Sequence, residues 1–357
     1  MKRAASLCML LACLSLVATA FVPTTANAAS TPEPLQFYEG KTIRIIVGFP
    51  PGGFYDLWSR LLARHMGRHL PGSPRFIVQN MPGAGSALAA NHLYQLAKPD
   101  GLTFGTVVGS LYLMQMGGAP GVEFNWPKFT FVGRTTGDTS VFYVRADSPY
   151  RTWQDVRAAK EPIPVGASGT ASGTYIVPQV MKETFGFNLN LITGYPGGAP
   201  IDAAMERGEL TGSSRSIGPY VGREPFLTWH KKGFVRPIVQ TGKERDRRVD
   251  ATVPTVWEVA KELRSPKADL EFMETAFKGL DEWFWLYIAP PGIPAERVKI
   301  LREGFHKALN DPRLREEGTK IGLFPDPTDP TEIQRLAAEV MNVDRKTVER
   351  VKRLLGH

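Results

Sequence analysis

Short apolar segments alternate with longer amphipathic ones along most of the chain, and Gly-rich turns separate the two kinds. Residues 41–47 are β-branched and apolar, which predicts a buried strand, and residues 55–69 repeat apolar side chains at helical spacing. A second strand, turn and helix follow at 76–97, and a third strand is expected at 103–108. Strands that alternate with helices in this way predict the α/β fold class.

A second set of such units begins after a β-rich stretch at residues 129–144, which is long enough to cross between two lobes. A chain of 357 residues exceeds one typical hydrophobic core, so two lobes are expected. The end of the chain predicts three helices, the last of them over residues 331–355. The predicted division is a signal segment at 1–28, a first lobe at 29–140, a second lobe at 141–240 and a return to the first lobe at 241–357.

The first 28 residues are typical of a secretory signal peptide, with Lys2 and Arg3 before an apolar run and an A-x-A cleavage site at 26–28. Both cysteines, Cys8 and Cys13, fall inside this segment. Its removal predicts an exported protein without cysteine. Such a protein has no disulfide, no thiolate metal ligand and no cysteine nucleophile.

The charge of the chain is modest. Loss of Lys2 and Arg3 with the signal lowers the formal net charge from +8 to +6, and acids interrupt the densest basic run, at 243–248. Nucleic-acid-binding proteins usually present an unbroken basic face, so we expect no nucleic-acid partner. A weak attraction for small anions fits this charge better. No apolar run of 18 residues follows the signal, so no transmembrane helix is expected.

Gly-rich turns lead into helices at 48–53, 80–86, 166–173 and 195–200. Such a turn leaves backbone N–H groups unpaired at a helix start, where the helix dipole favours an anion. Turns on two lobes could hold a carboxylate between them, although a single turn is more often only a tight connection. Nucleotide motifs are incomplete, because the first turn lacks Gly-Lys-Ser/Thr and Leu88 replaces the third glycine of a dinucleotide fingerprint.

Catalytic and metal-binding alternatives are weaker. Gly169 follows Ser168 directly, one residue too early for the second glycine of a G-x-S-x-G nucleophile elbow, which favours a turn hydroxyl or a ligand donor for Ser168. His65 and His69 have the i, i+4 spacing of metal ligands, but they lack the glutamate of a zinc helix and are expected on a solvated helix end. The aromatic run at 283–287 fits a stacking wall for an aromatic ligand, yet its alternation favours a buried strand. We therefore predict no catalytic residue, no metal and no cofactor.

Several motifs occur in a characteristic order. Residues 47–56, VGFPPGGFYD, match P-F-x-P-G-G-x-x-D, and residues 78–86, VQNMPGAGS, match V-x-N-x-P-G-A-G-G. Residues 99–103, PDGLT, match P-D-G-Y-T, and further matches lie at 166–173, 242–245, 253–258 and 289–294. Through these motifs and their order, the chain after the signal resembles the Bug family, the TctC-type periplasmic receptors of tripartite tricarboxylate transporters.

The resemblance implies a two-lobed periplasmic-binding-protein (Venus flytrap, type II) fold with a ligand cleft between the lobes. It also implies that backbone amides and hydroxyls of the turns hold a small carboxylate. Asp56 is expected to cap or orient its helix start. The implied first-lobe ligand residues are Phe49, Gly52, Gly53, Asn80, Gly83, Ala84, Gly85, Ser86 and Ser110. The implied second-lobe residues are Ala167, Ser168, Thr170, Ser172 and Tyr195.

The chain departs from the family pattern in four places. Ser86 replaces the last glycine of G-A-G-G, and residues 194–198, GYPGG, lack the lysine of the usual P-Y-K-G. Residues 211–216, TGSSRS, stand where the family usually has an apolar strand, and a longer loop is expected after them, through Lys232. The segment 261–281 is also longer than in the family.

Arg215 lies in the polar segment that replaces the apolar strand. We hypothesise that Arg215 takes the place of the missing lysine and binds a second carboxylate of the ligand, because guanidinium pairs with carboxylate bidentately. A salt bridge to Glu209 or a solvated loop arginine is the alternative.

Together these features predict a periplasmic receptor that captures a di- or tricarboxylate or an aromatic acid. We expect it to deliver that ligand to the large and small membrane subunits of a tripartite tricarboxylate-type permease. A ligand sensor that feeds a signalling receptor is the alternative. An exported hydrolase would need a nucleophile–base pair that the sequence does not show. We expect a monomer that is not an enzyme.

Overall fold

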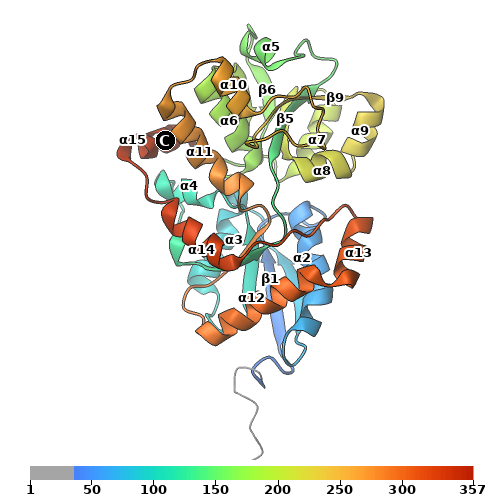
Figure 1. The fold of residues 1–357 in the computed structure, drawn as a ribbon, viewed down its shortest axis with the longest axis vertical. Helices are drawn as coiled ribbons and strands as arrows, with labels where there is room; N and C mark the ends of the chain where they lie inside the picture. Colours follow the sequence, from blue (N-terminus) through green and yellow to red (C-terminus); the bar gives the residue numbers. More distant parts are fainter. Residues whose placement is uncertain (1–35, 357) are drawn as a thin grey trace, which may run out of the picture.

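The computed structural model describes residues 36–356 and contains two five-stranded sheets, one in each of two lobes (Figure 1). The predicted signal segment at 1–28, with both cysteines, lies outside the described residues. The first sheet has the order β2-β1-β3-β10-β4, with β1 (Thr42–Val47), β2 (Arg75–Asn80), β3 (Thr103–Val107), β4 (Thr130–Arg134) and β10 (Leu286–Ala289). The second has the order β7-β6-β8-β5-β9, with β5 (Ser140–Arg145), β6 (Ile163–Gly166), β7 (Leu189–Ile192), β8 (Gly212–Ser216) and β9 (Val235–Gln240).

Each sheet contains one strand that runs against its neighbours, and that strand is the first after a crossing between the sheets. β5 is antiparallel to β8 and β9, and β10 is antiparallel to β3 and β4. The strands joined through helices are parallel, as β1 is to β2 and β3. Ligands of open α/β sheets bind beyond the carboxyl ends of such parallel strands.

Amphipathic helices cover both sheets, and within residues 36–356 no helix is long and apolar enough to span a membrane. Around the first sheet lie α2 (Phe54–His65), α3 (Ala87–Asn91), α4 (Leu111–Met116), α12 (Ala295–Asn310), α13 (Pro312–Lys320) and α14 (Pro330–Glu339) (Figure 1). Around the second lie α5 (Trp153–Arg157), α6 (Gly173–Phe185), α7 (Gly198–Glu206), α8 (Ile217–Gly222), α9 (Phe226–Lys232) and α10 (Val256–Glu262). The remaining helices are α11 (Lys267–Asp281) and α15 (Arg345–Leu354).

The single helix predicted over 331–355 is wrong, because the chain forms α14 and α15 with a break between them. Asp344 precedes α15, and its carboxylate accepts a hydrogen bond from the Thr347 amide at 2.8 Å. A side chain that caps a new helix start favours ending the previous helix before it.

The loop predicted from residue 211 to Lys232 is also wrong, since it contains β8, α8 and α9. β8 is a buried strand made of polar residues. The Ser213 hydroxyl donates to the Gly166 carbonyl at 2.9 Å, and the Ser214 hydroxyl donates to the Gly173 carbonyl at 2.8 Å. Burial of these hydroxyls is tolerated because each has a hydrogen-bond partner.

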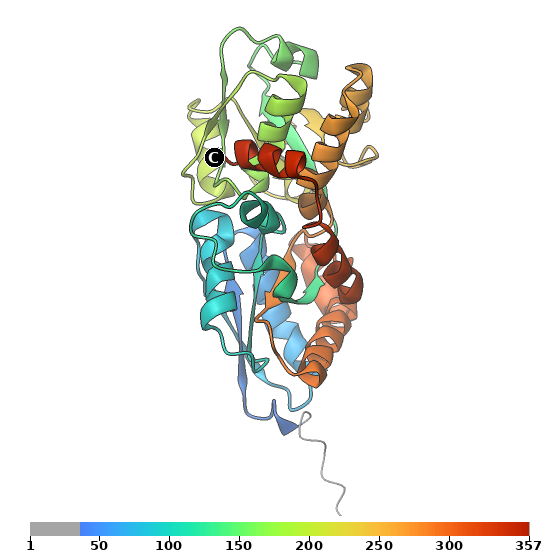
Figure 2. The ribbon, with the colours of Figure 1, turned by 90° about the vertical axis from the view of Figure 1, so that its left-hand side faces the viewer.

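The two lobes share a hydrophobic core along one side. One buried cluster runs from Leu113 of α4 through Phe277 of α11 to Val177 of α6. Figure 2 shows α15 at the level where the lobes meet, and α15 contacts both α4 and α6. The chain returns to the first sheet only at β10, after α10 and α11. The lobe boundaries at residues 140 and 240 stay predictions.

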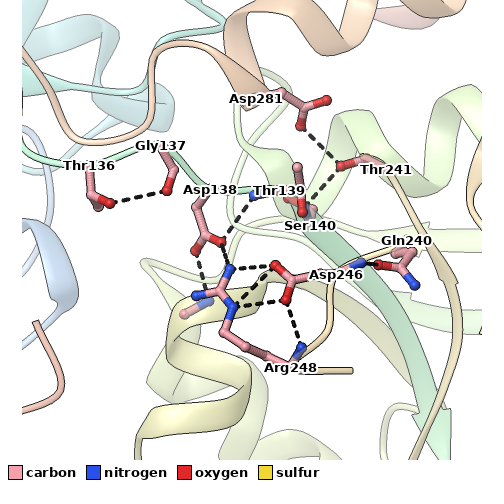
Figure 3. A network of polar contacts seen from close by, with 11 residues as sticks. Thr136, Gly137, Asp138, Thr139, Ser140, Gln240, Thr241, Asp246, Arg248 and Asp281 are labelled. Carbon is pink, nitrogen blue, oxygen red and sulfur yellow. Dashed lines mark hydrogen bonds and ion pairs between the residues drawn. The ribbon is translucent and has the colours of Figure 1, made fainter. Parts of the chain in front are cut away.

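A polar network joins the two segments of chain that cross between the sheets (Figure 3). Asp138, in the first crossing, accepts hydrogen bonds from Arg248 at 2.9 Å and from the Gly218 amide at 2.7 Å. Thr241, at the start of the second crossing, donates to Asp281 at 3.0 Å. Burial raises the pKa of Asp138 to about 6, although the positive charge of Arg248 acts to lower it. Burial also raises the pKa of Asp281, to about 8.

Candidate functional site

Residues of both lobes enclose a cavity of about 620 Å³. Its first-lobe wall comes from the turn between β1 and α2 and from the residues before β10. Its second-lobe wall comes from the starts of α6 and α7, the end of β8 and the connection between α8 and α9. The charged lining residues are Asp202, Glu206, Arg215, Arg223 and Glu224.

Asp56, in the first turn of α2, fixes the conformation of the turn after β1. Gly52 has a left-handed φ of 79°, and its amide donates to the Asp56 carboxylate at 2.8 Å. Burial favours the protonated acid, but hydrogen bonds from Arg60, Gly52 and Asn80 hold the pKa of Asp56 below its usual value. The expectation that Asp56 orients this helix start is confirmed.

Asn80 lies behind the turn and does not line the cavity. Its amide nitrogen donates to the Phe49 carbonyl at 2.9 Å and to the Asp56 carboxylate at 3.0 Å. Its oxygen accepts a hydrogen bond from Arg60 at 3.3 Å. In this structure Asn80 therefore positions the β1–α2 turn, and direct contact with a ligand stays a prediction for it.

The second Gly-rich turn contacts the other lobe. Gly85 has a left-handed φ of 60°, and a Cβ at this position would lie 3.2 Å from that of Ala171. The Ser110 hydroxyl donates to the Ala171 carbonyl, while the Ser86 hydroxyl accepts from the Val108 amide at 3.0 Å. Small residues here let the lobes approach closely.

The predicted ligand residues thus divide into two groups. Those that line the cavity are Phe49, Gly52, Gly53, Ser168, Ser172 and Arg215. Those outside its lining are Asn80, Gly83, Ala84, Gly85, Ser86, Ser110, Ala167, Thr170 and Tyr195. The first group brings the β1–α2 turn of one lobe to the α6 start and the β8 end of the other.

Three hydroxyls meet where α6 begins. The Thr174 hydroxyl accepts from the Ser168 amide at 3.0 Å and lies 2.7 Å from the Ser172 hydroxyl. Ser172 also donates to the Gly169 carbonyl at 2.6 Å. Among the described residues, the Ser168 hydroxyl has Thr174 as its side-chain hydrogen-bond partner and makes no hydrogen bond to a histidine or a carboxylate. Sequence analysis missed Thr174, which lines the cavity.

Arg215 forms a salt bridge with Asp202, and the two side chains are 14% and 10% exposed. It also donates to the Gly198 carbonyl at 3.3 Å. Burial lowers the pKa of Arg215, but Asp202 and Tyr143 together outweigh burial and raise the pKa above its usual value. Glu209 pairs instead with Arg207. The Glu209 partner and the solvated arginine are therefore both wrong, and contact between Arg215 and a ligand stays a prediction.

Arg223 is a second arginine in the lining, which sequence analysis missed. It belongs to the second lobe and donates to the first-lobe carbonyl of Gly52 at 3.0 Å. Its guanidinium carbon lies 5.4 Å from the ring centre of Phe54. Burial and the charge of Arg215 lower the pKa of Arg223, while Asp202 opposes that shift. Among residues 36–356, no carboxylate forms a salt bridge with it.

Aromatic side chains form the first-lobe wall. Phe49 and Tyr55 stack with ring centres 4.2 Å apart, and Phe54 lies 5.2 Å from Trp285. Phe284 completes this group, which we call the aromatic wall. The strand predicted for 283–287 begins only at Leu286, and Phe284 and Trp285 before it line the cavity. Contact between these rings and a ligand stays a prediction.

The expectation of a solvated helix end at His65 and His69 is wrong. His65 is buried and lies 2.6 Å from the Glu317 carboxylate, and His69 lies 2.9 Å from that of Asp311. Both acids belong to α13 or its cap, which covers this end. In the described part of the chain, no three potential ligands gather as a metal site. Most of the long segment 261–281 forms α11 (Lys267–Asp281), whose Leu280 lines the cavity.

Comparison with known proteins finds a matching family model and similar curated proteins. The sequence model of the tripartite tricarboxylate transporter family receptor matches residues 59–352. The UPF0065 protein in the gbd 5′ region of Cupriavidus necator is 25% identical over 339 residues, covering 93% of this chain and 92% of that protein. The protein BugT of Bordetella pertussis is 24% identical, covering 91% of this chain and 96% of BugT.

Solved structures share the fold. The periplasmic binding protein BugD has a TM-score of 0.68 at 18% identity, with 89% of this chain and 98% of BugD covered. MatC from Rhodopseudomonas palustris, solved with bound malate, has a TM-score of 0.66 at 22% identity, with 88% and 99% covered. An R. palustris protein solved with adipate has a TM-score of 0.66 at 19% identity, with 89% and 98% covered. The chain therefore belongs to the Bug/TctC family, the receptors of tripartite tricarboxylate transporters, and has their two-lobed periplasmic-binding-protein fold.

Proposed function

We propose that the protein is a periplasmic solute-binding receptor that captures a small carboxylate and delivers it to the membrane subunits of a tripartite tricarboxylate permease. The observation that carries this proposal is the convergence of three helix starts on the cavity between the lobes. Gly53, Thr174 and Gly198 stand at the starts of α2, α6 and α7, and all three line the cavity.

Helix starts bind anions through backbone groups. The first-turn amides have no acceptor within their own helix, and the helix dipole adds about half a positive charge at each start. The residues that precede these helices are Gly53, Ser172 and Gly197. In the described structure none of them caps its helix with a side-chain hydrogen bond, so no cap side chain occupies the first amides. Amides from both lobes can therefore donate to one carboxylate, with the hydroxyl of Ser168 as a further donor.

The solved neighbours agree with this ligand class. Malate and adipate, which their structures hold, are both small carboxylates. A ligand that contacts both lobes stabilises the closed arrangement over an open one. We infer that the large and small permease subunits recognise this closed form.

The remaining features of the proposal follow from the sequence. Cleavage after the predicted signal at 1–28 exports the chain to the periplasm. We propose a first lobe of 29–140 with 241–357 and a second lobe of 141–240, although α10 of the return segment lies around the second sheet. We expect a monomer that binds its ligand without turning it over, since the family consists of receptors.

A ligand screen tests the proposal. Native mass spectrometry of the exported protein should show a co-purified carboxylate. Thermal unfolding with malate, adipate, citrate and aromatic monocarboxylates should then identify a stabilising compound, worth about 2.7 kcal/mol at 100 times its Kd. Stabilisation by none of these carboxylates, with intact folding by circular dichroism, would contradict the proposed function.

A further inference from the structure

The charged side chains of the cavity favour a ligand with few negative charges. Two arginines and three acids line the cavity, so its side chains hold more carboxylates than cations. Asp202 already neutralises Arg215. A di- or tricarboxylate would bring further negative charges beside Asp202, Glu206 and Glu224, and like charges in a cleft repel. This balance favours a single carboxylate.

Arg223 is the cation suited to that carboxylate. A guanidinium has five N–H donors, and the described structure gives Arg223 one hydrogen bond, to the Gly52 carbonyl at 3.0 Å. That bond places the guanidinium beside the start of α2, where backbone amides also favour an anion. One carboxylate can therefore accept hydrogen bonds from Arg223 and from the β1–α2 turn together.

The aromatic wall adjoins this position. The guanidinium carbon of Arg223 lies 5.4 Å from the centre of the Phe54 ring, which in turn lies 5.2 Å from that of Trp285. Phe226 faces the cavity from the second lobe. Aromatic rings prefer offset or edge contacts with other rings, and a flat ring makes more such contacts here than a short polar chain does. The volume of about 620 Å³ leaves room for a ring.

We propose that the ligand of this cavity is a monocarboxylate with an aromatic body, whose carboxylate binds Arg223 and whose ring lies against the aromatic wall. This inference rests on the proposed function, because it narrows the carboxylate that the receptor captures. Arg223 is then the residue that selects for the charge, and Phe54 with Trp285 selects for the ring. Arg215 is already paired with Asp202, so this proposal does not depend on a contact between Arg215 and the ligand.

Isothermal titration with defined probes tests this assignment. The aromatic probes are benzoate, phenylacetate and 3-phenylpropionate, and the polar probes are malate and citrate. At least one aromatic acid should bind roughly tenfold or more tightly than either polar probe, as expected for added ring burial. The matching neutral amide, for example phenylacetamide, should bind more weakly than the acid.

Two variants with matched controls test the roles of Arg223 and Phe54 in ligand binding. Arg223→Met should weaken the best aromatic acid about tenfold or more and leave its neutral amide almost unchanged. Arg247→Met removes an exposed arginine outside the cavity and should change neither. Phe54→Leu should weaken the aromatic acid, whereas Phe324→Leu, at a side chain 58% exposed and outside the cavity, should not.

The outcomes separate this inference from the proposed function. Tightest binding of malate or citrate would overturn the aromatic monocarboxylate and keep the carboxylate receptor. If Arg223→Met lowered the affinity for the acid and for its neutral amide equally, the proposed contact between Arg223 and the carboxylate would be overturned. Binding by no carboxylate would contradict the proposed function and, with it, this inference.

Discussion

Arg215 and Asp202 form a buried ion pair in the wall of the cavity, and Gly198 makes room for it. A Cβ at Gly198 would overlap the guanidinium of Arg215, so the start of α7 has a glycine where the arginine passes. The arginine that the sequence marks as a departure from its family thus has a partner within the same lobe. A buried pair of this kind is sensitive to the loss of one member, because the other is left charged and desolvated.

Arg215→Met should therefore destabilise the fold by about 3–5 kcal/mol, because Asp202 would remain buried without its partner. Adding Asp202→Asn to that variant should recover part of the loss. Urea unfolding of the single and double variants measures both effects. Arg207→Met, which breaks the exposed pair with Glu209, serves as the control and should leave the unfolding midpoint unchanged. Equal stability of the single variant and the wild type would contradict a stabilising role.

Asn80→Ala should weaken ligand binding although Asn80 lies outside the cavity lining. The substitution removes two donated hydrogen bonds that fix the β1–α2 turn and should cost about 1–3 kcal/mol of stability. Asn188→Ala is the matched control, since it removes hydrogen bonds to Ala159 and Lys160 away from the cavity. Titration of the ligand found in the screen should show lower affinity for Asn80→Ala only. Unchanged affinity there would mean that the turn keeps its shape without Asn80.

Gly85→Leu should hold the lobes apart. A side chain at Gly85 would press on Ala171 of the second lobe, where a Cβ already lies 3.2 Å away. Small-angle scattering should show a larger radius of gyration with ligand present, and titration should show weaker binding. Gly118→Leu shares the left-handed backbone, with φ of 67°, but meets nothing within 4 Å, so it controls for the backbone strain. The same compact, ligand-bound form in both variants would contradict closure at this contact.

The local patterns of the sequence were sufficient for the apolar strands and for the turns at helix starts, but not for β8. The apolar run of β1, the glycines after it and the amphipathic face of α2 are all encoded within a few neighbouring residues. These local signals predicted the two lobes and placed Gly52 and Gly53 on the cavity. The motif containing Asn80 was found as well, but a motif does not show that the amide points back toward the turn.

The rest of the site depends on contacts between distant segments. β8 is polar in sequence and becomes a strand because its serines find acceptors at Gly166 and Gly173. Arg223 reaches the cavity only because the second lobe brings it to Gly52, 171 positions earlier in the chain. Phe54 and Trp285 likewise meet across the first lobe. Periodicity carries no signal for such pairings, so the charge and ring contacts of the cavity could not be predicted from it.

The stability of the protein should fall as pH rises from about 4 to 8, through Asp281 in the network of Figure 3. Burial raises the pKa of Asp281 to about 8, with Glu282 and Asp138 adding to the shift and the Thr241 hydrogen bond opposing it. An acid whose pKa is higher in the folded state stabilises the fold while it is protonated in both states. That stability is lost as pH rises through the folded-state value, at up to about 1.4 kcal/mol per pH unit for one proton.

Asp281→Asn keeps an acceptor for Thr241 and removes the titration of this side chain. The pH dependence of stability should then flatten between pH 6 and 8, because Asp281, with a pKa of about 8, titrates there and Asp138, with a pKa of about 6, loses its proton below this range. Asp138, whose pKa is raised to about 6, should still lower stability between about pH 4 and 6. Urea unfolding at half-unit pH steps measures this change. Asp250→Asn is the control: Thr252 holds the pKa of this exposed acid below its usual value, so its effect belongs below pH 4. An unchanged slope above pH 6 in Asp281→Asn would show that Asp281 is already ionised there and that another group sets the dependence.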